Sequence, residues 1–331
     1  MTTAAIDIDC ISQSHLSEII ISSTIISYHR YYADKSPNWP HDVYMKQVNM
    51  KVKDILLIGR GHLGTYLKKR LEIPDELHYT DELADIKTIL KKKSLDVVIN
   101  TAGKTSLEWC EANPLETFRC NVIAPLTAWR AYREYQSKHS LFIHISSGCV
   151  WNGPFPPSGL GFLPDEPPTP QCFYSWTKAA CDAMMLRETF GRNLCILRPR
   201  QVYSPIRSPR NTLTKLITYP KLIRTQNSMT SAETIAKTIE RLSQHPPHCK
   251  DGRIINVYDD GVITPFDVGN LLAEAGLREP PIEMTKNDLD KTLVPKRVDT
   301  VLEDLFFEDL VHPPDITTEM KRVIEEFRRN K

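Results

Sequence analysis

Three residues near the middle of the chain have the types and spacing that act on a carbonyl group. Ser147 lies in HISSGCVWNG, directly after an apolar run, and Tyr174 and Lys178 stand four positions apart in YSWTK. In a helix, that spacing puts the phenol and the ammonium on one face. A nearby ammonium favours ionisation of a phenol, whose ordinary pKa is about 10, and so lowers its pKa toward neutrality. The pattern predicts that Tyr174 protonates a carbonyl oxygen, which Ser147 also contacts.

A reduced carbonyl needs a hydride donor, and a glycine-rich loop upstream predicts where one binds. The apolar run 55–58 leads into Gly59-x-Gly61-x-x-Gly64, followed by apolar residues at helical spacing. The first glycine permits a tight turn, the second lets the backbone approach a pyrophosphate, and the third lets helix and strand pack closely. The helix N-terminus then faces the phosphates. The loop residues expected to contact a nicotinamide dinucleotide are Gly59, Arg60, Gly61, His62, Leu63 and Gly64.

Two residues give opposite indications about which dinucleotide binds. Asp81, at the end of the second expected strand in ELHYTD, would hold a ribose 2′-hydroxyl and favours NAD. Arg60, inside the glycine loop, would meet a 2′-phosphate and favours NADP. The cofactor is therefore expected to be NADP or NAD in its reduced form. The remaining expected cofactor contacts follow the third strand or lie on the tyrosine helix: Asn100, Ala102, Gly103, Tyr174 and Lys178.

The order of apolar runs predicts an α/β fold. Strands alternate with helices over about a hundred residues, which indicates a Rossmann-type doubly wound parallel sheet. We expect residues 51–200 to form the NAD(P)-binding Rossmann domain. Residues 201–331 are expected to form a smaller C-terminal substrate-binding lobe, interleaved with the Rossmann core. Residues 1–50 precede both as an N-terminal extension with no assigned role.

Composition excludes several classes of function. The chain has 42 basic and 41 acidic residues among 331, a net charge of +1, so no charge field indicates nucleic acid or a membrane surface. No apolar run reaches membrane-spanning length. The 8 cysteines are scattered without metal-ligand spacing. They predict free thiols in a reducing compartment, hence a cytoplasmic protein, and no metal site.

The segment LRPRQVYSPIRSPRN is rich in arginine and proline. Rigid loops that present guanidinium groups are suited to binding a diphosphate. Arg200, Arg210 and Asn211 are therefore the candidate substrate-binding residues.

With these residues in view, the sequence resembles the extended short-chain dehydrogenase/reductases, and within them the dTDP-4-dehydrorhamnose reductase group. ISSGCVWNG is similar to that group's strand end, FYSWTK to its Tyr-x-x-x-Lys, and VPKRVDTVLEDL to its C-terminal element. A closer resemblance is to the bifunctional nucleotide-rhamnose synthase/epimerase-reductases, which act on UDP- or dTDP-4-keto-6-deoxyglucose. The matching stretches run in family order from residue 55 to 310: LEWCE, SSGCVWNG, GLGFLPDEPPTP, FYSWTK, LRPRQVYS, PRNTLTKL and NSMT.

This resemblance implies NAD(P)H-dependent reduction of a 4-keto-6-deoxy nucleotide sugar, with 3,5-epimerisation, toward a rhamnose-type product. Cys149 matches the family's epimerase cysteine, and Lys215 in NTLTKL matches its lysine partner. Strand alternation would put Cys149 on the same side as Ser147 if the extended conformation continued that far. The expected partners are the nucleotide sugar and a second copy of the chain. The second strand shows no basic residue for a 2′-phosphate, which departs from the family's NADPH preference.

Two other interpretations fit the same residues. In one, the protein is a 4-ketoreductase without epimerase activity, and Cys149 is a small buried side chain. In the other, it is a non-catalytic regulatory subunit on the same fold, like the one that partners methionine adenosyltransferase. Ser147, Tyr174 and Lys178 are all present, which argues against the regulatory interpretation, because a regulator does not need them.

Overall fold

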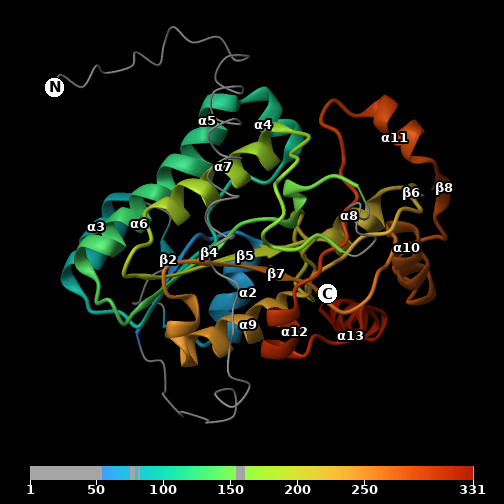
Figure 1. The fold of residues 1–331 in the computed structure, drawn as a ribbon. Coiled ribbons are helices and arrows are strands. Elements are labelled where there is room, and N and C mark those ends of the chain that lie inside the picture. Colours follow the sequence, from blue (N-terminus) through green and yellow to red (C-terminus); the bar gives the residue numbers. More distant parts are fainter. Residues whose placement is uncertain (1–53, 75–78, 81–82, 154–160, 331) are drawn as a thin grey trace, which may run out of the picture. The chain divides into compact units, whose positions relative to one another are not determined.

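The parallel sheet expected from the alternating pattern is present in the computed structural model, which describes residues 54–74, 79–80, 83–153 and 161–330. Six strands pair in parallel in the order β2-β1-β3-β4-β5-β7 (Figure 1). These strands are β1 (Ile55–Ile58), β2 (Tyr79–Thr80), β3 (Val97–Asn100), β4 (Leu141–Ile145), β5 (Asn193–Pro199) and β7 (Arg253–Val257). The fold is thus the α/β Rossmann type. The proposed extension 1–50 lies outside the described residues.

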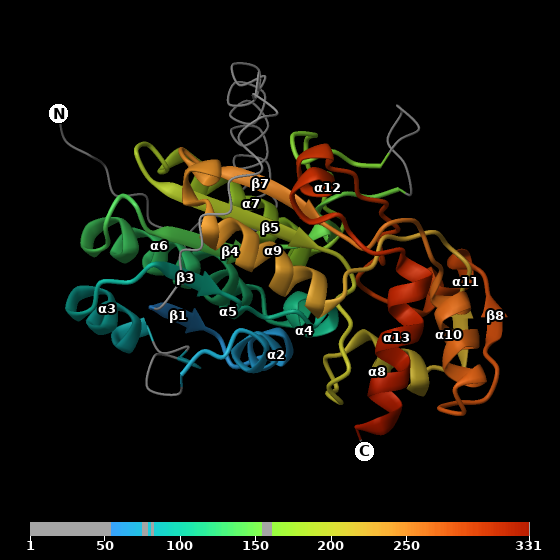
Figure 2. The ribbon, with the colours of Figure 1, turned by 90° about the horizontal axis from the view of Figure 1, so that it is seen from below.

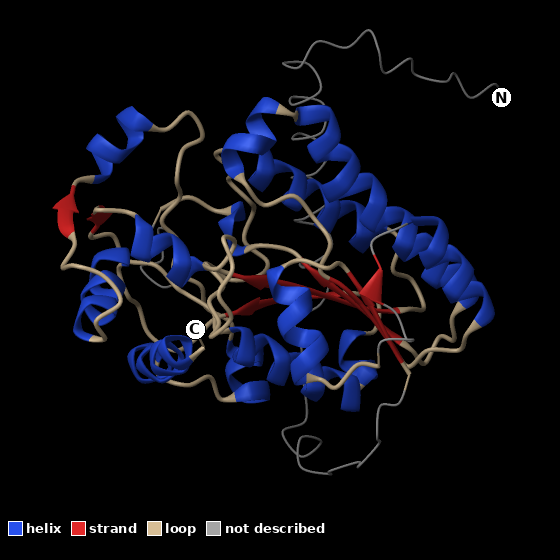
Figure 3. Cartoon of the chain, turned by 180° about the vertical axis from the view of Figure 1, so that it is seen from behind, coloured by secondary structure: helices blue, strands red, loops and turns tan. Residues whose placement is uncertain are grey.

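Helices cover both faces of this sheet, which explains why its central strands are buried along their whole length. Figure 3 shows the strands between the helical layers. One face carries α3 (Leu83–Lys92), α4 (Leu107–Ala112), α5 (Pro114–Phe118), α6 (Ala124–Tyr135) and α7 (Phe173–Arg187). The other face carries α2 (His62–Arg70), α9 (Ala232–Gln244) and α12 (Leu305–Val311).

The strand order reverses beside β1. After β1 the chain moves to β2 on one side, and β3 then pairs with the other side of β1. Ligands of open α/β sheets bind outside the carboxyl ends of the strands at such a reversal. The loops that follow β1 and β3 therefore border the expected cofactor crevice.

A smaller lobe follows β5. Two short parallel strands, β6 (Lys221–Ile223) and β8 (Ile282–Met284), pair apart from the main sheet (Figure 2). Around them lie α8 (Thr212–Thr218), α10 (Pro265–Glu274), α11 (Lys286–Thr292) and α13 (Ile316–Arg329). Leu213, Leu222, Val268 and Phe327 belong to its separate apolar core. Because α9, β7 and α12 return to the main sheet, the lobe and the Rossmann core alternate along the chain.

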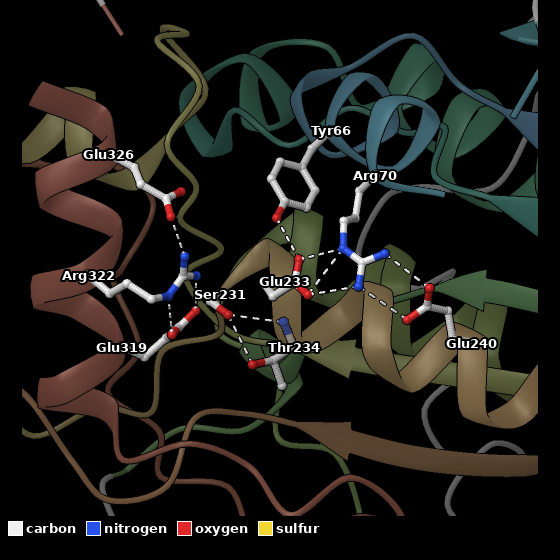
Figure 4. Close-up of polar contacts among 9 residues, drawn as sticks. All are labelled: Tyr66, Arg70, Ser231, Glu233, Thr234, Glu240, Glu319, Arg322 and Glu326. Carbon is white, nitrogen blue, oxygen red and sulfur yellow. Dashed lines mark hydrogen bonds and ion pairs between the residues drawn. The ribbon is translucent and has the colours of Figure 1, made fainter. Parts of the chain in front are cut away.

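Ion pairs and a hydrogen bond join the helix after the glycine loop, α2, to α9, which packs beside it on the same face of the sheet (Figure 4). Glu233 on α9 accepts hydrogen bonds from Tyr66 Oη at 2.9 Å and from Arg70 Nε at 2.8 Å, both on α2. Arg70 Nη1 also donates to Glu240, about two turns further along α9, at 3.0 Å. The contacts hold α2 at a defined angle, and its N-terminus directly follows the glycine loop.

Candidate active site

The glycine loop is shaped so that its backbone lies open to a ligand. Gly59 has φ +107°, and a Cβ on it would lie 2.6 Å from the backbone nitrogen of Ala102. A Cβ on Gly64 would overlap the carbonyl oxygen of Gly59. Gly61 is the N-cap of α2 and has no side chain over the helix N-terminus. These residues fit the pyrophosphate of a dinucleotide. Gly59 and Gly64 allow backbone segments to approach closely, and Gly61 leaves the space in front of the helix N-terminus open.

The loop after β3 is held beside the glycine loop by its own side chains. Thr101 Oγ1 donates to the carbonyl oxygen of Ile58 at 2.9 Å, and Asn100 Oδ1 accepts from Ala102 N at 3.1 Å. The Asn100 amide also contacts His144 Nδ1 at 3.1 Å. Asn100 is almost wholly buried. Its side chain therefore orders the loop, and Ala102 presents backbone toward the crevice.

His62 and Arg210 bring the smaller lobe to the glycine loop. His62 Nε2 lies 3.1 Å from Ser204 Oγ, and a Cβ on Gly61 would lie 3.2 Å from Arg210 Nη1. Burial, with Lys215 and Arg210 nearby, lowers the pKa of His62 to about 4, so the imidazole is neutral at pH 7. Arg60 and Leu63 stay partly or fully exposed at the same loop. Asp81 lies outside the described residues.

Ser147, Tyr174 and Lys178 are brought together at the carboxyl end of β4. Ser147 follows that strand, and the other two lie on α7, all three buried. Lys178 Nζ donates to the carbonyl oxygen of Ile145 at 2.9 Å, and the ammonium lies 3.8 Å from where a Cβ on Gly103 would be. The β3 loop of the cofactor crevice therefore adjoins the lysine.

The pKa of Tyr174 departs from the expectation based on the ammonium alone. Burial raises the pKa of Tyr174, the charge of Cys149 raises it further, and a hydrogen bond with Ser147 opposes both. Burial also lowers the pKa of Lys178. Removing water from the phenol outweighs a lysine whose Nζ donates to a carbonyl oxygen. The phenol is therefore protonated at neutral pH, as a proton donor must be.

Cys149 lies in a turn, because the extended conformation on which the strand-alternation argument depended ends at Ser147. Ser147 is the last extended residue, and Gly148–Val150 form a 3₁₀ turn, η5. Ser147 Oγ accepts from Cys149 N at 3.1 Å and so caps that turn. The thiol is half-buried and interacts electrostatically with both Tyr174 and Lys215.

Lys215 lies on α8 of the smaller lobe, where it is exposed by surface area and interacts electrostatically with Cys149. Burial is the largest cause lowering the pKa of Lys215, and Arg297 and Arg210 lower it too, while Glu108 and Cys149 oppose them. Arg297 forms an ion pair with Glu108 on α4. The five candidate catalytic residues thus come from the turn after β4, from α7 and from α8.

The three candidate substrate-binding residues have different surroundings. Arg200 is buried, donating from Nη1 to Cys149 Sγ at 2.7 Å and from Nη2 to Asn227 Oδ1 at 2.5 Å, so it is not a loop arginine turned to solvent. Asn211 caps α8, and its amide donates to the carbonyl oxygens of Ser204 and Ile206, each at 2.7 Å. Those bonds leave Asn211 a structural role. Arg210 remains a candidate for binding a phosphate.

Asn121 is a site residue that the sequence reasoning missed. It lies in the π-helical segment η4 (Arg119–Ile123), which interrupts the regular helix before α6. Its Oδ1 accepts from Lys104 N at 2.7 Å, and its Nδ2 donates to Thr177 Oγ1 at 3.2 Å. Because a Cβ on Gly103 would lie 3.2 Å from that Oδ1, Asn121 supports the loop beside Lys178. No spacing in the sequence signals a π-turn.

Comparison with known proteins decides the family. The model of the NAD dependent epimerase/dehydratase family matches residues 52–234. The chain belongs to this family. The glycine loop, the serine strand end and the tyrosine helix all lie within the matched residues.

Curated relatives from Arabidopsis thaliana are similar to this family member over much of its length. A bifunctional dTDP-4-dehydrorhamnose 3,5-epimerase/dTDP-4-dehydrorhamnose reductase is 28% identical over 249 residues, which are 71% of this chain and 79% of the relative. A trifunctional UDP-glucose 4,6-dehydratase/UDP-4-keto-6-deoxy-D-glucose 3,5-epimerase/UDP-4-keto-L-rhamnose-reductase is 35% identical over 170 residues, which are 50% of this chain. Those residues cover 24% of the trifunctional protein.

Solved structures confirm the fold. A UDP-rhamnose synthase from Acanthamoeba polyphaga mimivirus has a TM-score of 0.72 at 19% identity, over 82% of this chain and 99% of that one. A dTDP-4-dehydrorhamnose reductase from Bacillus anthracis in complex with NADP has a TM-score of 0.67 at 16% identity, over 84% of this chain and 100% of that one. The expected nicotinamide dinucleotide is consistent with the family and with the glycine cradle described above.

In the described parts of the chain, no group of three or more His, Cys, Asp or Glu side chains is arranged to hold a metal ion. Among the described helices, none has the length and apolar character needed to cross a membrane. The seven cysteines within the described ranges are all free thiols.

Proposed function

We propose that the protein reduces the 4-keto group of a 4-keto-6-deoxy nucleotide sugar with NADPH or NADH, after epimerising carbons 3 and 5. The product is a rhamnose-type nucleotide sugar. The observation that carries the proposal is a site in which a protonated Tyr174 lies with Ser147 and Lys178 beside the glycine loop. In the same site Cys149 interacts electrostatically with Tyr174 and with Lys215. Both chemistries are named together in the curated relatives.

Reduction uses the proton that burial keeps on Tyr174. The bound reduced cofactor supplies the hydride. Tyr174 then donates its proton to the oxygen of the former ketone, and Ser147, whose Oγ accepts from Cys149 N, has a hydroxyl proton left to donate to the same oxygen. Lys178, beside the phenol on α7, stabilises the phenolate that remains. Glycine-loop residues 59–64, together with Ala102 and Gly103, would hold the cofactor.

Epimerisation uses the acidity of carbon atoms next to the ketone. Cys149 as thiolate takes the proton from carbon 3 or 5, and the electron pair of that C–H bond moves onto the ketone oxygen as an enolate. Tyr174 and Ser147 stabilise the enolate oxygen. Lys215 as ammonium returns a proton to the opposite face, which inverts the centre. Transfer of a proton from Cys149 to Lys215 through solvent restores both groups.

Three further assignments complete the proposal. Arg210 binds a phosphate at the mouth of the glycine loop, and exposed Arg60 favours a 2′-phosphate and thus NADP. Exposed Leu115 and Ile123, with Met184 on α7, support a homodimer through this helical face. The cysteines within the described ranges are free thiols, which supports a cytoplasmic location.

The test is incubation with UDP- and dTDP-4-keto-6-deoxyglucose and NADPH or NADH, with the product identified by NMR. Oxidation of the cofactor and a sugar inverted at carbons 3 and 5 are expected. A reduced sugar with both centres retained would support the 4-ketoreductase alternative instead. Cofactor binding without any oxidation, with either sugar, would support the regulatory subunit.

A further inference from the structure

A buried arginine lies against the thiol of the active site. Arg200 follows β5, is 3% exposed, and donates from Nη1 to Cys149 Sγ at 2.7 Å. Its Nη2 donates to Asn227 Oδ1 at 2.5 Å and to the carbonyl oxygen of Val298. Its backbone nitrogen donates to Thr230 Oγ1 at 2.9 Å. The guanidinium is therefore held from several segments that are distant in sequence.

The hydrogen-bond partners of this guanidinium within the described ranges include no carboxylate. Among the described residues, no ion pair joins Arg200 to an Asp or Glu; its partners are an amide oxygen, a carbonyl oxygen and sulfur. Its Nε is buried without a hydrogen-bond partner. Arg198, two residues earlier and equally buried, instead pairs with Asp182 at 2.9 Å. Because an uncompensated buried charge is costly, an anion is expected where Arg200 contacts Cys149.

We infer that Arg200 holds Cys149 as a thiolate in a buried guanidinium–thiolate ion pair, before any sugar binds. Cys149 loses its proton to solvent, and the negative sulfur neutralises the charge of Arg200. Arg200 is thus a positioning residue, fixing both the ionisation and the place of the sulfur. The use of that thiolate as the base of epimerisation rests on the proposed function, but the ion pair itself does not.

Other charged and titratable groups also face the sulfur. Lys215 from the smaller lobe favours the thiolate as well. Tyr174 and Cys172 also interact with Cys149 and oppose a second negative charge nearby, so they stay protonated while the sulfur is ionised. Arg200 is distinguished from Lys215 by direct contact with the sulfur and by deeper burial. Because the surroundings of Arg200 are less polar, its attraction to the sulfur is stronger than that of the more solvated Lys215.

The ion pair is tested on the full chain without cofactor or sugar. The ultraviolet absorbance of a thiolate is measured against pH in the wild type and in Cys149→Ser, whose difference isolates this sulfur. In parallel, the rate of alkylation by iodoacetamide is measured for each cysteine by peptide mass spectrometry. The wild type should show one thiolate per chain at neutral pH that Cys149→Ser lacks. Absence of this difference would overturn the inference even without further variants.

Variants then identify the responsible cation. Arg200→Met should lower the alkylation rate of Cys149 at neutral pH about tenfold, because the thiolate then loses the cation in contact with it. Arg200→Lys should restore part of that rate. The half-exposed Cys120, alkylated in the same sample, should be unaffected and serves as the internal control. If Lys215→Met reduces the rate more than Arg200→Met does, the assignment to Arg200 is wrong.

Failure of the ion pair and failure of the proposed function give different results. The absorbance and alkylation measurements involve no sugar. A thiolate that depends on Arg200, together with no deuterium exchange at carbons 3 and 5 of the keto-sugar, would leave the ion pair intact and remove the epimerase proposal. Deuterium exchange in a protein whose Cys149 is not a thiolate before the sugar binds would overturn the ion pair and leave the epimerase proposal intact.

Discussion

A Cβ on Gly61 would lie 3.2 Å from Nη1 of Arg210, so the glycine loop of the main sheet meets an arginine of the smaller lobe. The nearest atom is the end of a flexible side chain, not backbone. A larger residue at 61 can therefore be accommodated in the fold while it fills the space expected for the pyrophosphate. This separation of folding from ligand binding makes the position a clean test of the cofactor site.

Gly61→Val should abolish binding of NADPH and NADH while leaving a folded protein. The valine side chain would occupy the close approach that the pyrophosphate needs, and Arg210 can move aside. Calorimetric titration measures the affinity, and circular dichroism checks the fold. Gly191→Ala is the control for a general loss of stability, because its φ of +70° disfavours a side chain while a Cβ there meets no atom within 4 Å. Undiminished affinity in Gly61→Val would contradict the dinucleotide site.

Tyr174→Phe should slow reduction of the keto-sugar by about 10²–10⁴-fold, the usual contribution of general acid catalysis. Only the hydroxyl is lost, so the fold and the cofactor affinity should survive. Because burial raises the pKa of Tyr174, the acid form persists above the ordinary range. The wild-type rate should consequently show no loss from tyrosine ionisation up to a pH of about 10. Stopped-flow oxidation of NADPH measures both effects, and a near wild-type rate would exclude Tyr174 as the acid.

Cys149→Ser should block proton exchange at carbons 3 and 5 but leave reduction of an already epimerised sugar. A serine hydroxyl is nearly isosteric with the thiol and far less acidic, so it supplies no comparable anion. Deuterium incorporation from heavy water is followed by NMR without reduced cofactor, so that the ketone persists. Lys215→Met should also impair inversion, because the opposite face then lacks its proton donor. Exchange in Cys149→Ser as fast as in the wild type would make the cysteine a packing residue.

Glu233→Gln should reduce the free energy of unfolding by about 1 kcal/mol, the upper range for a partly exposed ion pair. It weakens the contacts of Tyr66 and Arg70 on α2, so the affinity for NADPH should fall as the helix N-terminus loses its fixed angle. Urea denaturation and calorimetry measure the two quantities. Glu325→Gln is the matched control, since its pairs lie within α13 alone. Equal losses in both variants would show that the α2–α9 link does not position the loop.

Much of this molecule follows from patterns that are local in sequence. The apolar run before Gly59 predicts a strand, and the spacing of apolar residues after it predicts a helix. The glycines between them predict the tight turn that connects the two. Tyr174 and Lys178 share a helix face because four residues make about one turn. The order of strands and helices predicts the parallel sheet and brings Ser147, at the end of β4, to the same edge as the glycine loop.

Other features depend on contacts between residues far apart in the chain. Arg200 was predicted to bind the diphosphate of the substrate from a rigid loop, yet its guanidinium is buried against Cys149, Asn227 and Val298. Asn211 became a helix cap, and the π-turn at Asn121 has no sequence signature. The pKa of Tyr174 rises because the surrounding segments exclude water, which outweighs the effect of a lysine one turn away. Burial is a property of the packed whole, and the charges that matter in this site are decided by what surrounds each group after folding.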